Sequence, residues 1–271
     1  MTVPVIQEVQ YSEEFNDADD YDVGLDALSI SSGNLLLMLI GNDGPFFTDQ
    51  FTNNVSGWNF GFDVGDNVSD CHAAFYWRIA DETEGASVSV SPNNADLKWD
   101  AWVLRITGHD PTTPINASQA TNFTNTSTSR PIAEVTTTVA DCLGIYFLCC
   151  DNSQGEPFSV SGTGWSEADE QSGAGGFFAA TYGTKSIASA GGSGTATVTA
   201  TGADGAAGFQ LAVAPEAADE GVVIGSSHDV QDNVARGATR QRWIHQRNFF
   251  KLFTNDYGWK KQQSGLLVPS I

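Results

Sequence analysis

The stretch of this chain whose residue types most suggest catalysis is W-S-E-A-D-E-Q, residues 165–171. In an extended strand alternate side chains share a face, so Glu167, Asp169 and Gln171 would line one side. Cleavage of a glycosidic bond on a strand uses a Glu-x-Asp-x-Glu row, with the catalytic carboxylates on one face. The third position of this row is an amide, however, so the second carboxylate of such a site is missing. We therefore expect a polar hairpin loop here and no glycosidase site.

The other reactive residue types lack the spacing of known catalytic sites. No G-x-S-x-G segment occurs, which leaves a hydrolase of that type unsupported. The glycine-rich pieces at 173–176 and 190–194 have no lysine and no helical pattern after them, so they do not predict a phosphate-binding loop. No zinc site is predicted, because no histidine stands four residues from another or near a cysteine pair; the four are His72, His109, His228 and His245. We expect no enzymatic activity and no cofactor.

Four cysteines are present, and their spacing does not suggest a metal site. Cys149 and Cys150 are neighbours on a predicted strand and point to opposite faces, so we expect no ordinary disulfide between them. A pairing that involves Cys71 stays open, and buried reduced thiols are the expected state in a chain made in the cytoplasm. The acidic run at 13–22 offers oxygen ligands for Ca²⁺ but lacks the D-x-[DN]-x-[DN]-G pattern, so a solvated loop is expected.

The elements that must position these side chains are predicted to be β-strands separated by turns. In D-A-W-V-L-R-I (100–106) Trp102, Leu104 and Ile106 form a large apolar face, and the turn signal G-H-D-P (108–111) ends the strand. The apolar run at 32–44 predicts a strand buried on both faces, and S-V-S-V (87–90) alternates with period two. The 28 glycines also favour short strands and turns over helices. The predicted class is all-β.

Features of the first half recur in the same order in the second half. Residues 144–152 correspond to 35–43, Gly164 and Trp165 to Gly57 and Trp58, 176–183 to 72–79, and 206–215 to 100–108. Each half holds four or five short strands, too few to bury two faces alone. Together they predict a two-sheet antiparallel sandwich of jelly-roll type with one core. The polar stretch 112–131 between them is expected to be an extended surface connection.

The net charge of −21 is unevenly distributed. Residues 1–224 hold five Lys and Arg against 30 Asp and Glu, whereas residues 225–271 hold seven against three. An acidic body repels phosphate backbones and anionic membrane surfaces, so neither nucleic acid nor membrane is an expected partner. The first ten residues show no secretory signal pattern, and no apolar run approaches the ~18 residues of a membrane span.

The C-terminal segment 221–271, expected to be irregular or partly helical, interleaves cations with aromatic residues. Its apolar area is too large to stay in water, so we expect it to pack on a partner as a docking arm. Folding back onto its own acidic domain remains the alternative. The candidate docking residues are Arg240, Arg242, Trp243, Arg247, Phe249, Phe250, Phe253, Tyr257 and Trp259.

A string of short segments extends over residues 30–215: G-N-L-L-L (33–37), Y-W-R-I-A-D (76–81), V-L-R-I-T-G-H-D-P-T-T-P-I (103–115), V-T-T-T-V (135–139), G-W-S-E (164–167) and A-A-G-F-Q-L-A-V (206–213). The string resembles a β-sandwich family common among bacteriophage virion proteins: minor structural, tail-fibre and capsid decoration proteins. The resemblance implies a non-enzymatic virion protein assembled in the host cytoplasm, with a body at 1–220 facing outward and an arm at 221–271 anchoring it. It also implies other virion proteins as partners and a homo-oligomer, for which we favour a trimer.

An alternative function from another class is a carbohydrate-binding module that recognises glycans on a host surface. Exposed Trp58, Trp99 or Trp165 would then stack on sugar rings. This hypothesis requires an uncovered aromatic platform on one sheet face. Burial of all three tryptophans would remove its basis.

Overall fold

In a computed structural model of the chain, the described residues are 2–18, 20–43, 50–65, 71–93, 97–123, 127–151, 157–172, 178–202, 205–217, 260–261 and 267–268. The chain divides into two compact units, residues 1–218 and 219–271. In the second unit the described residues form only a short antiparallel pair, β18 (Lys260–Lys261) with β19 (Leu267–Val268). The first unit holds all the other described elements.

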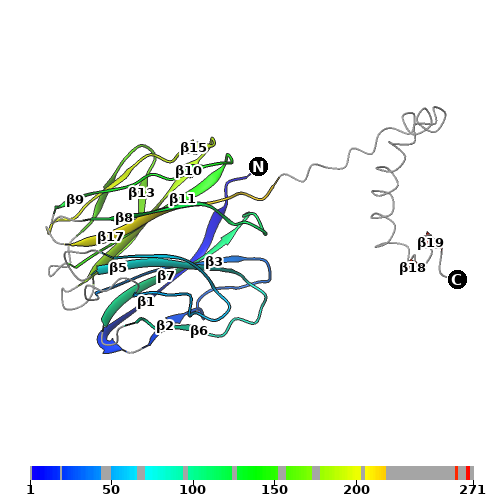
Figure 1. The fold of residues 1–271 in the computed structure, drawn as a ribbon, viewed down its shortest axis with the longest axis horizontal. Helices are drawn as coiled ribbons and strands as arrows, with labels where there is room; N and C mark the ends of the chain where they lie inside the picture. Colours follow the sequence, from blue (N-terminus) through cyan, green and yellow to red (C-terminus); the bar gives the residue numbers. More distant parts are fainter. Residues whose placement is uncertain are drawn as a thin grey trace. The chain divides into compact units, whose positions relative to one another are not determined.

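Two five-stranded antiparallel sheets form the centre of the first unit (Figure 1). The first has the order β1 (Val5–Ala18), β7 (Leu97–Thr107), β3 (Leu35–Asp43), β5 (Cys71–Ile79), β4 (Asn59–Gly65). The second has the order β8 (Ile115–Asn122), β17 (Ala206–Val213), β11 (Cys142–Cys150), β14 (Ala179–Ile187), β13 (Ser166–Ser172). The described part of the chain contains no helix, so the expected all-β, antiparallel sandwich class is confirmed.

Smaller sheets flank the two large ones. They are β2 (Tyr21–Gly24) with β6 (Ser87–Val90), β9 (Ser129–Ile132) with β16 (Ala196–Thr199) and β12 (Ser159–Ser161), and β10 (Thr136–Thr137) with β15 (Gly191–Gly192). The structure therefore has several sheets where the sequence predicted two.

The two large sheets share one strand order, with β1, β7, β3, β5 and β4 corresponding to β8, β17, β11, β14 and β13. At the centre of the first sheet Leu39 pairs with Phe75 and Trp102. At the same place in the second sheet Phe147 pairs with Tyr182 and Phe209. Equivalent residues are therefore 107 or 108 positions apart. The expected segment matches agree with this order. The match of Gly57 and Trp58 with Gly164 and Trp165 is in register, whereas the three longer matches are displaced by one to three positions.

The prediction of one core is wrong, because the described residues form four hydrophobic clusters. The first, which we call the central core, lies between the two large sheets and includes Leu39 and Phe147. The second lies between the outer face of the first large sheet and β2 and β6, where it includes Met38 and Tyr21. A third cluster covers the outer face of the second large sheet, and a fourth, smaller one includes Val135. Because β3 and β11 are apolar on both faces, each sheet must be covered on both sides.

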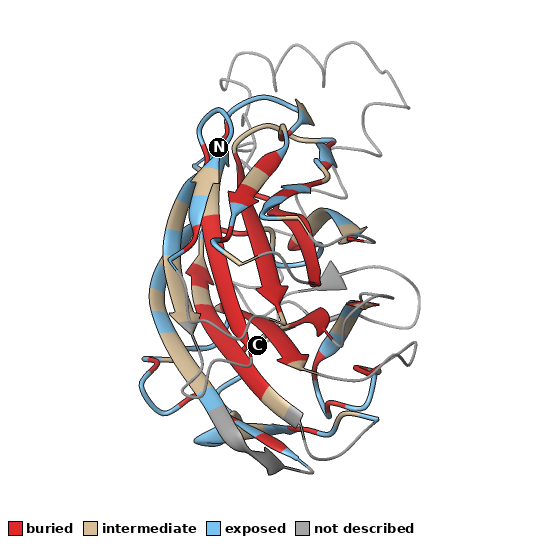
Figure 2. Ribbon diagram, turned by 90° about the vertical axis from the view of Figure 1, so that its left-hand side faces the viewer, coloured by how far each residue is buried: buried red, intermediate tan, exposed pale blue. Residues whose placement is uncertain are grey.

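Three segments expected to be loops or connections are edge strands of the large sheets. Residues 13–18 of the acidic run belong to β1, and its residues 21 and 22 belong to the small sheet of β2. The connection at 112–131 contains β8, and residues 165–171 lie mostly in β13. Edge strands form one hydrogen-bonded ladder and carry polar side chains, so their sequences lack the apolar alternation that marks a strand. In Figure 2 the strand that starts near the N-terminus is mostly intermediate or exposed, whereas the central strands are buried.

Candidate functional site

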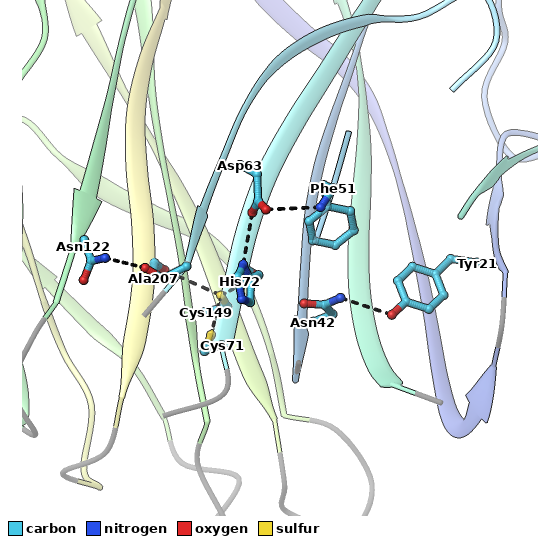
Figure 3. A network of polar contacts seen from close by, with 10 residues as sticks. Tyr21, Asn42, Phe51, Asp63, Cys71, His72, Asn122, Cys149 and Ala207 are labelled. Carbon is cyan, nitrogen blue, oxygen red and sulfur yellow. Dashed lines mark hydrogen bonds and ion pairs between the residues drawn. The ribbon is translucent and has the colours of Figure 1, made fainter. Parts of the chain in front are cut away.

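A cluster of buried polar residues lies at one end of the first large sheet, and we call it the His72 cluster: Tyr21, Asn42, Asp63, His72 and Trp99. His72 on β5 pairs across the strands with Asn42 on β3, and Asn42 pairs on its other side with Trp99 on β7. Because side chains alternate along a strand, these three lie on the outer face of the sheet, toward the second hydrophobic cluster. Figure 3 shows the cluster apart from Trp99.

An aspartate and a histidine form the centre of the His72 cluster. The His72 Nδ1 donates to Asp63 Oδ1 over 3.3 Å, and both side chains are 3% exposed. The other oxygen, Asp63 Oδ2, accepts from the Phe51 backbone N–H at 3.2 Å. The carboxylate therefore orients the imidazole and holds the segment that carries Phe51.

A second pair closes the other side of the cluster. Asn42 Nδ2 donates to the Tyr21 hydroxyl at 3.2 Å, and the Tyr21 ring stacks on Trp99 with centroids 4.9 Å apart. Burial raises the pKa of Tyr21, so the phenol keeps its proton.

Three buried polar atoms of the cluster have no hydrogen-bond partner within the described part of the chain: His72 Nε2, Asn42 Oδ1 and Trp99 Nε1. Their residues are at most 3% exposed. An unsatisfied buried polar group costs about 1–3 kcal/mol, so these atoms favour a further hydrogen-bonding partner. These atoms can hydrogen bond a small polar molecule.

The second half shows that the fold does not require this polarity. The positions equivalent to Asn42, His72 and Trp99 hold Cys150, Ala179 and Ala206, which pair with one another in the same way. All three are buried in the third hydrophobic cluster. The carboxylate is repeated, however, because Glu170 accepts from the Phe158 N–H as Asp63 does from Phe51. The carboxylate thus holds the backbone in the same way in both halves, whereas the histidine is found only in the first half.

The chemistry open to the cluster is limited by its other members. An Asp–His pair can act as a general base, but nucleophilic catalysis also needs a hydroxyl or thiol against the imidazole. The nearest thiol in sequence, Cys71, belongs to the central core on the opposite face of the sheet. Among the described residues no three His, Cys, Asp or Glu side chains are arranged to hold a metal ion. Among the described residues, the arrangement is suited to hydrogen bonding.

Glu167 and Asp169 do not share a face, because β13 has a bulge at Ala168. Glu167 pairs with Gly183, whereas Asp169 pairs with Tyr182 and accepts from Trp102 Nε1 at 2.9 Å, on the side of the central core. Glu167 accepts from the Thr181 hydroxyl at 3.4 Å on the other side. Burial and the nearby Glu170 raise the pKa of Glu167 to about 7. Both expectations, a shared face and a hairpin loop, are therefore wrong.

The tryptophans expected to form a sugar platform are buried. The exposed fractions are 6% for Trp58, 3% for Trp99 and 7% for Trp165. Trp165 also donates from Nε1 to the Gly194 carbonyl at 3.1 Å. The stacking surface that the carbohydrate hypothesis required of these residues is absent.

The four cysteines are all buried. Cys149 belongs to the central core and Cys150 to the third cluster, which confirms that these neighbours point to opposite faces. The nine candidate docking residues of the arm, from Arg240 to Trp259, lie outside the described residues. No helix in the described part of the chain is long and apolar enough to cross a membrane.

Comparison with known proteins found no matching family model, no similar curated protein and no similar solved structure. A functional proposal therefore rests on the sequence and the structure of this chain.

Proposed function

We propose that the chain is a non-enzymatic structural protein of a bacteriophage virion, whose β body faces outward and whose C-terminal arm holds it to the particle. The carrying observation is that a strongly acidic compact unit precedes a separate unit rich in cations and aromatic residues. Residues 225–271 hold seven Lys and Arg against three acidic residues. Such a segment matches a carboxylate-bearing neighbour in charge.

The architecture of the body supports a structural role. We propose that each half is a jelly-roll-type sandwich, where the sequence suggested a single one. Within the first half the chain passes between facing sheets, because β1, β3, β5 and β7 share the large sheet while β2 pairs with β6 across the second cluster. The second half repeats this with β9 and β16. Jelly rolls recur in viral capsid proteins, although fold analogy alone does not define a function.

The arm supplies the contacts in this proposal. Its rings at Trp243, Phe249, Phe250, Phe253, Tyr257 and Trp259 would be interface anchors, and its arginines would reach carboxylates on a neighbouring subunit. The partners are other virion proteins of the head or tail and further copies of the chain, with a trimer favoured. The acidic body argues against nucleic acid and membranes as partners.

Deletion of residues 225–271 tests the proposal. The truncated body should stay soluble and folded, and gradient-purified particles from infected cells should contain at least tenfold less of it by quantitative mass spectrometry. The triple change Arg240→Glu, Arg242→Glu, Arg247→Glu should have the same effect. The matched control replaces the same arginines with lysine and should retain most incorporation. Normal copy number of the truncated protein would refute the assignment.

A further inference from the structure

Two cysteines from different halves of the body meet in the central core. Cys71 lies on β5 and Cys149 on β11, both are fully buried, and their Sγ atoms are 2.8 Å apart (Figure 3). We propose that these two residues are a modification site, at which a disulfide forms under oxidising conditions and joins the two halves covalently. This inference does not depend on the proposed function.

The equivalent positions in the two halves show that the fold does not require two cysteines here. By the pairing of the sheets, the residue equivalent to Cys149 is Gly41 and the residue equivalent to Cys71 is Phe178. A Cβ on Gly41 would lie 3.0 Å from both the Phe178 ring and the Cys149 Cβ. In the central core the Phe178 ring therefore lies over Gly41, whereas at the equivalent positions the sulfur atoms of Cys71 and Cys149 lie together. Side chains from both large sheets therefore meet in the part of the central core that contains Cys71 and Cys149.

The other two thiols have different surroundings. Cys150 faces the third cluster, and Cys142 belongs to the fourth cluster and donates to the Val139 carbonyl at 3.4 Å. Since a disulfide needs Cβ atoms about 3.5–4.5 Å apart and facing one another, neither of these is a partner for Cys71. The geometry therefore predicts a single disulfide, between Cys71 and Cys149.

The oxidant in this proposal is a small-molecule disulfide such as glutathione disulfide. One cysteine thiolate attacks it, forming a mixed disulfide and releasing one small thiol. The second cysteine thiolate then attacks the protein-bound sulfur and releases the other small thiol. In total two protein thiols lose two electrons and two protons, and one small disulfide becomes two thiols. Because burial raises the pKa of both cysteines and excludes the oxidant, the step proceeds while the chain folds or opens.

The test uses the full chain, purified with reductant, unfolded, and refolded with either glutathione disulfide or reductant. After oxidation, alkylation under denaturing conditions should find two reactive thiols instead of four, and peptide mass mapping should link Cys71 to Cys149. The midpoint of thermal unfolding should rise by roughly 10 °C, because a crosslink between residues 78 apart restricts the unfolded chain.

Variants make the outcome specific. Cys71→Ala and Cys149→Ala should lose the link and the difference between oxidised and reduced midpoints, whereas Cys142→Ala and Cys150→Ala should keep both. Four reactive thiols in the oxidised wild-type chain would overturn the proposal, and so would a link to Cys142 or Cys150. Mapping of the wild-type chain decides the matter even if an alanine variant does not fold.

Discussion

At the scale of single residues, the buried carboxylate of Asp100 is strongly affected by its surroundings. The Tyr11 hydroxyl lies 2.5 Å from Asp100 Oδ1 and 2.6 Å from a Glu13 oxygen, yet it can donate only one proton. Burial raises the pKa of Asp100 to about 7, and the charge of Glu13 adds to the rise. A protonated Asp100 would donate to Tyr11 and leave the phenol proton for Glu13.

We predict that Asp100→Asn stabilises the protein more at pH 8 than at pH 5. The pKa of Asp100 is higher in the folded chain than the ~3.9 of an unfolded aspartate, so the folded state binds more protons between the two values. The free energy of unfolding of the wild-type chain therefore falls as the pH rises from about 4 to 7. Asparagine does not titrate, so the variant does not show this decrease. The difference of about three pKa units limits the stabilisation by Asp100→Asn to about 4 kcal/mol.

Urea unfolding at the two pH values measures this effect. Asp22→Asn, at an exposed position of β2, is the control and should show no comparable pH dependence. An equal change for Asp100→Asn at both pH values would contradict the assignment of a buried, protonated carboxyl.

At the scale of elements, the pairing of β4 with β5 shows how the His72 cluster is accommodated. Gly65 is the direct cross-strand partner of His72, and a Cβ placed on it would run into the imidazole ring. The imidazole ring thus lies over Gly65, and the missing side chain at position 65 leaves room for the Asp63–His72 pair. The two positions should therefore be coupled in stability.

We predict that Gly65→Ala destabilises the wild-type chain by about 1–3 kcal/mol, the usual cost of overpacking. The same substitution should cost little in a His72→Ala background, because the imidazole is gone. Chemical denaturation of the two single variants and the double variant measures the coupling energy. Gly85→Ala is the control, since the nearest atom to its added Cβ is at 3.5 Å and the position is exposed. Additive costs at positions 65 and 72 would contradict the packing.

Sequence patterns predicted the central strands well and the edges poorly. The apolar stretches at 35–43 and 100–106 identify β3 and β7, because strands buried on both faces must be apolar throughout. The acidic end of β1, together with β8 and β13, was assigned to loops or connections, since an edge strand is held mainly by its backbone. The His72 cluster was missed, because its members come from β2, β3, β4, β5 and β7 and only the sheet register brings them together. A histidine within an otherwise apolar strand was the available signal.

At the scale of the whole body, the central core joins the two halves into one folding unit. Aromatic contacts cross between the sheets, with ring centroids 5.6 Å apart for Trp102 and Tyr182 and 5.5 Å apart for Phe75 and Phe209. Neither large sheet can lose its partner without exposing this face to water. The repeated strand order therefore does not imply independent stability.

We predict that residues 1–218 unfold in one cooperative transition and that Phe209→Ala lowers its midpoint as a whole. The side chain is fully buried, and removal of such a ring costs about 3–5 kcal/mol. Calorimetry together with circular dichroism should give coincident transitions. Val9→Ala, at a 40% exposed position, is the control and should change stability little. Two separated transitions of the body would contradict the shared core.

The common strand order has a consequence for the history of this chain. Two copies of one half would bury the same face against each other, as in an isologous homodimer. Fusion of such a dimer into one polypeptide releases each copy from the constraint of identity. One copy can then carry an ionisable side chain where its twin keeps a methyl group, as positions 72 and 179 do.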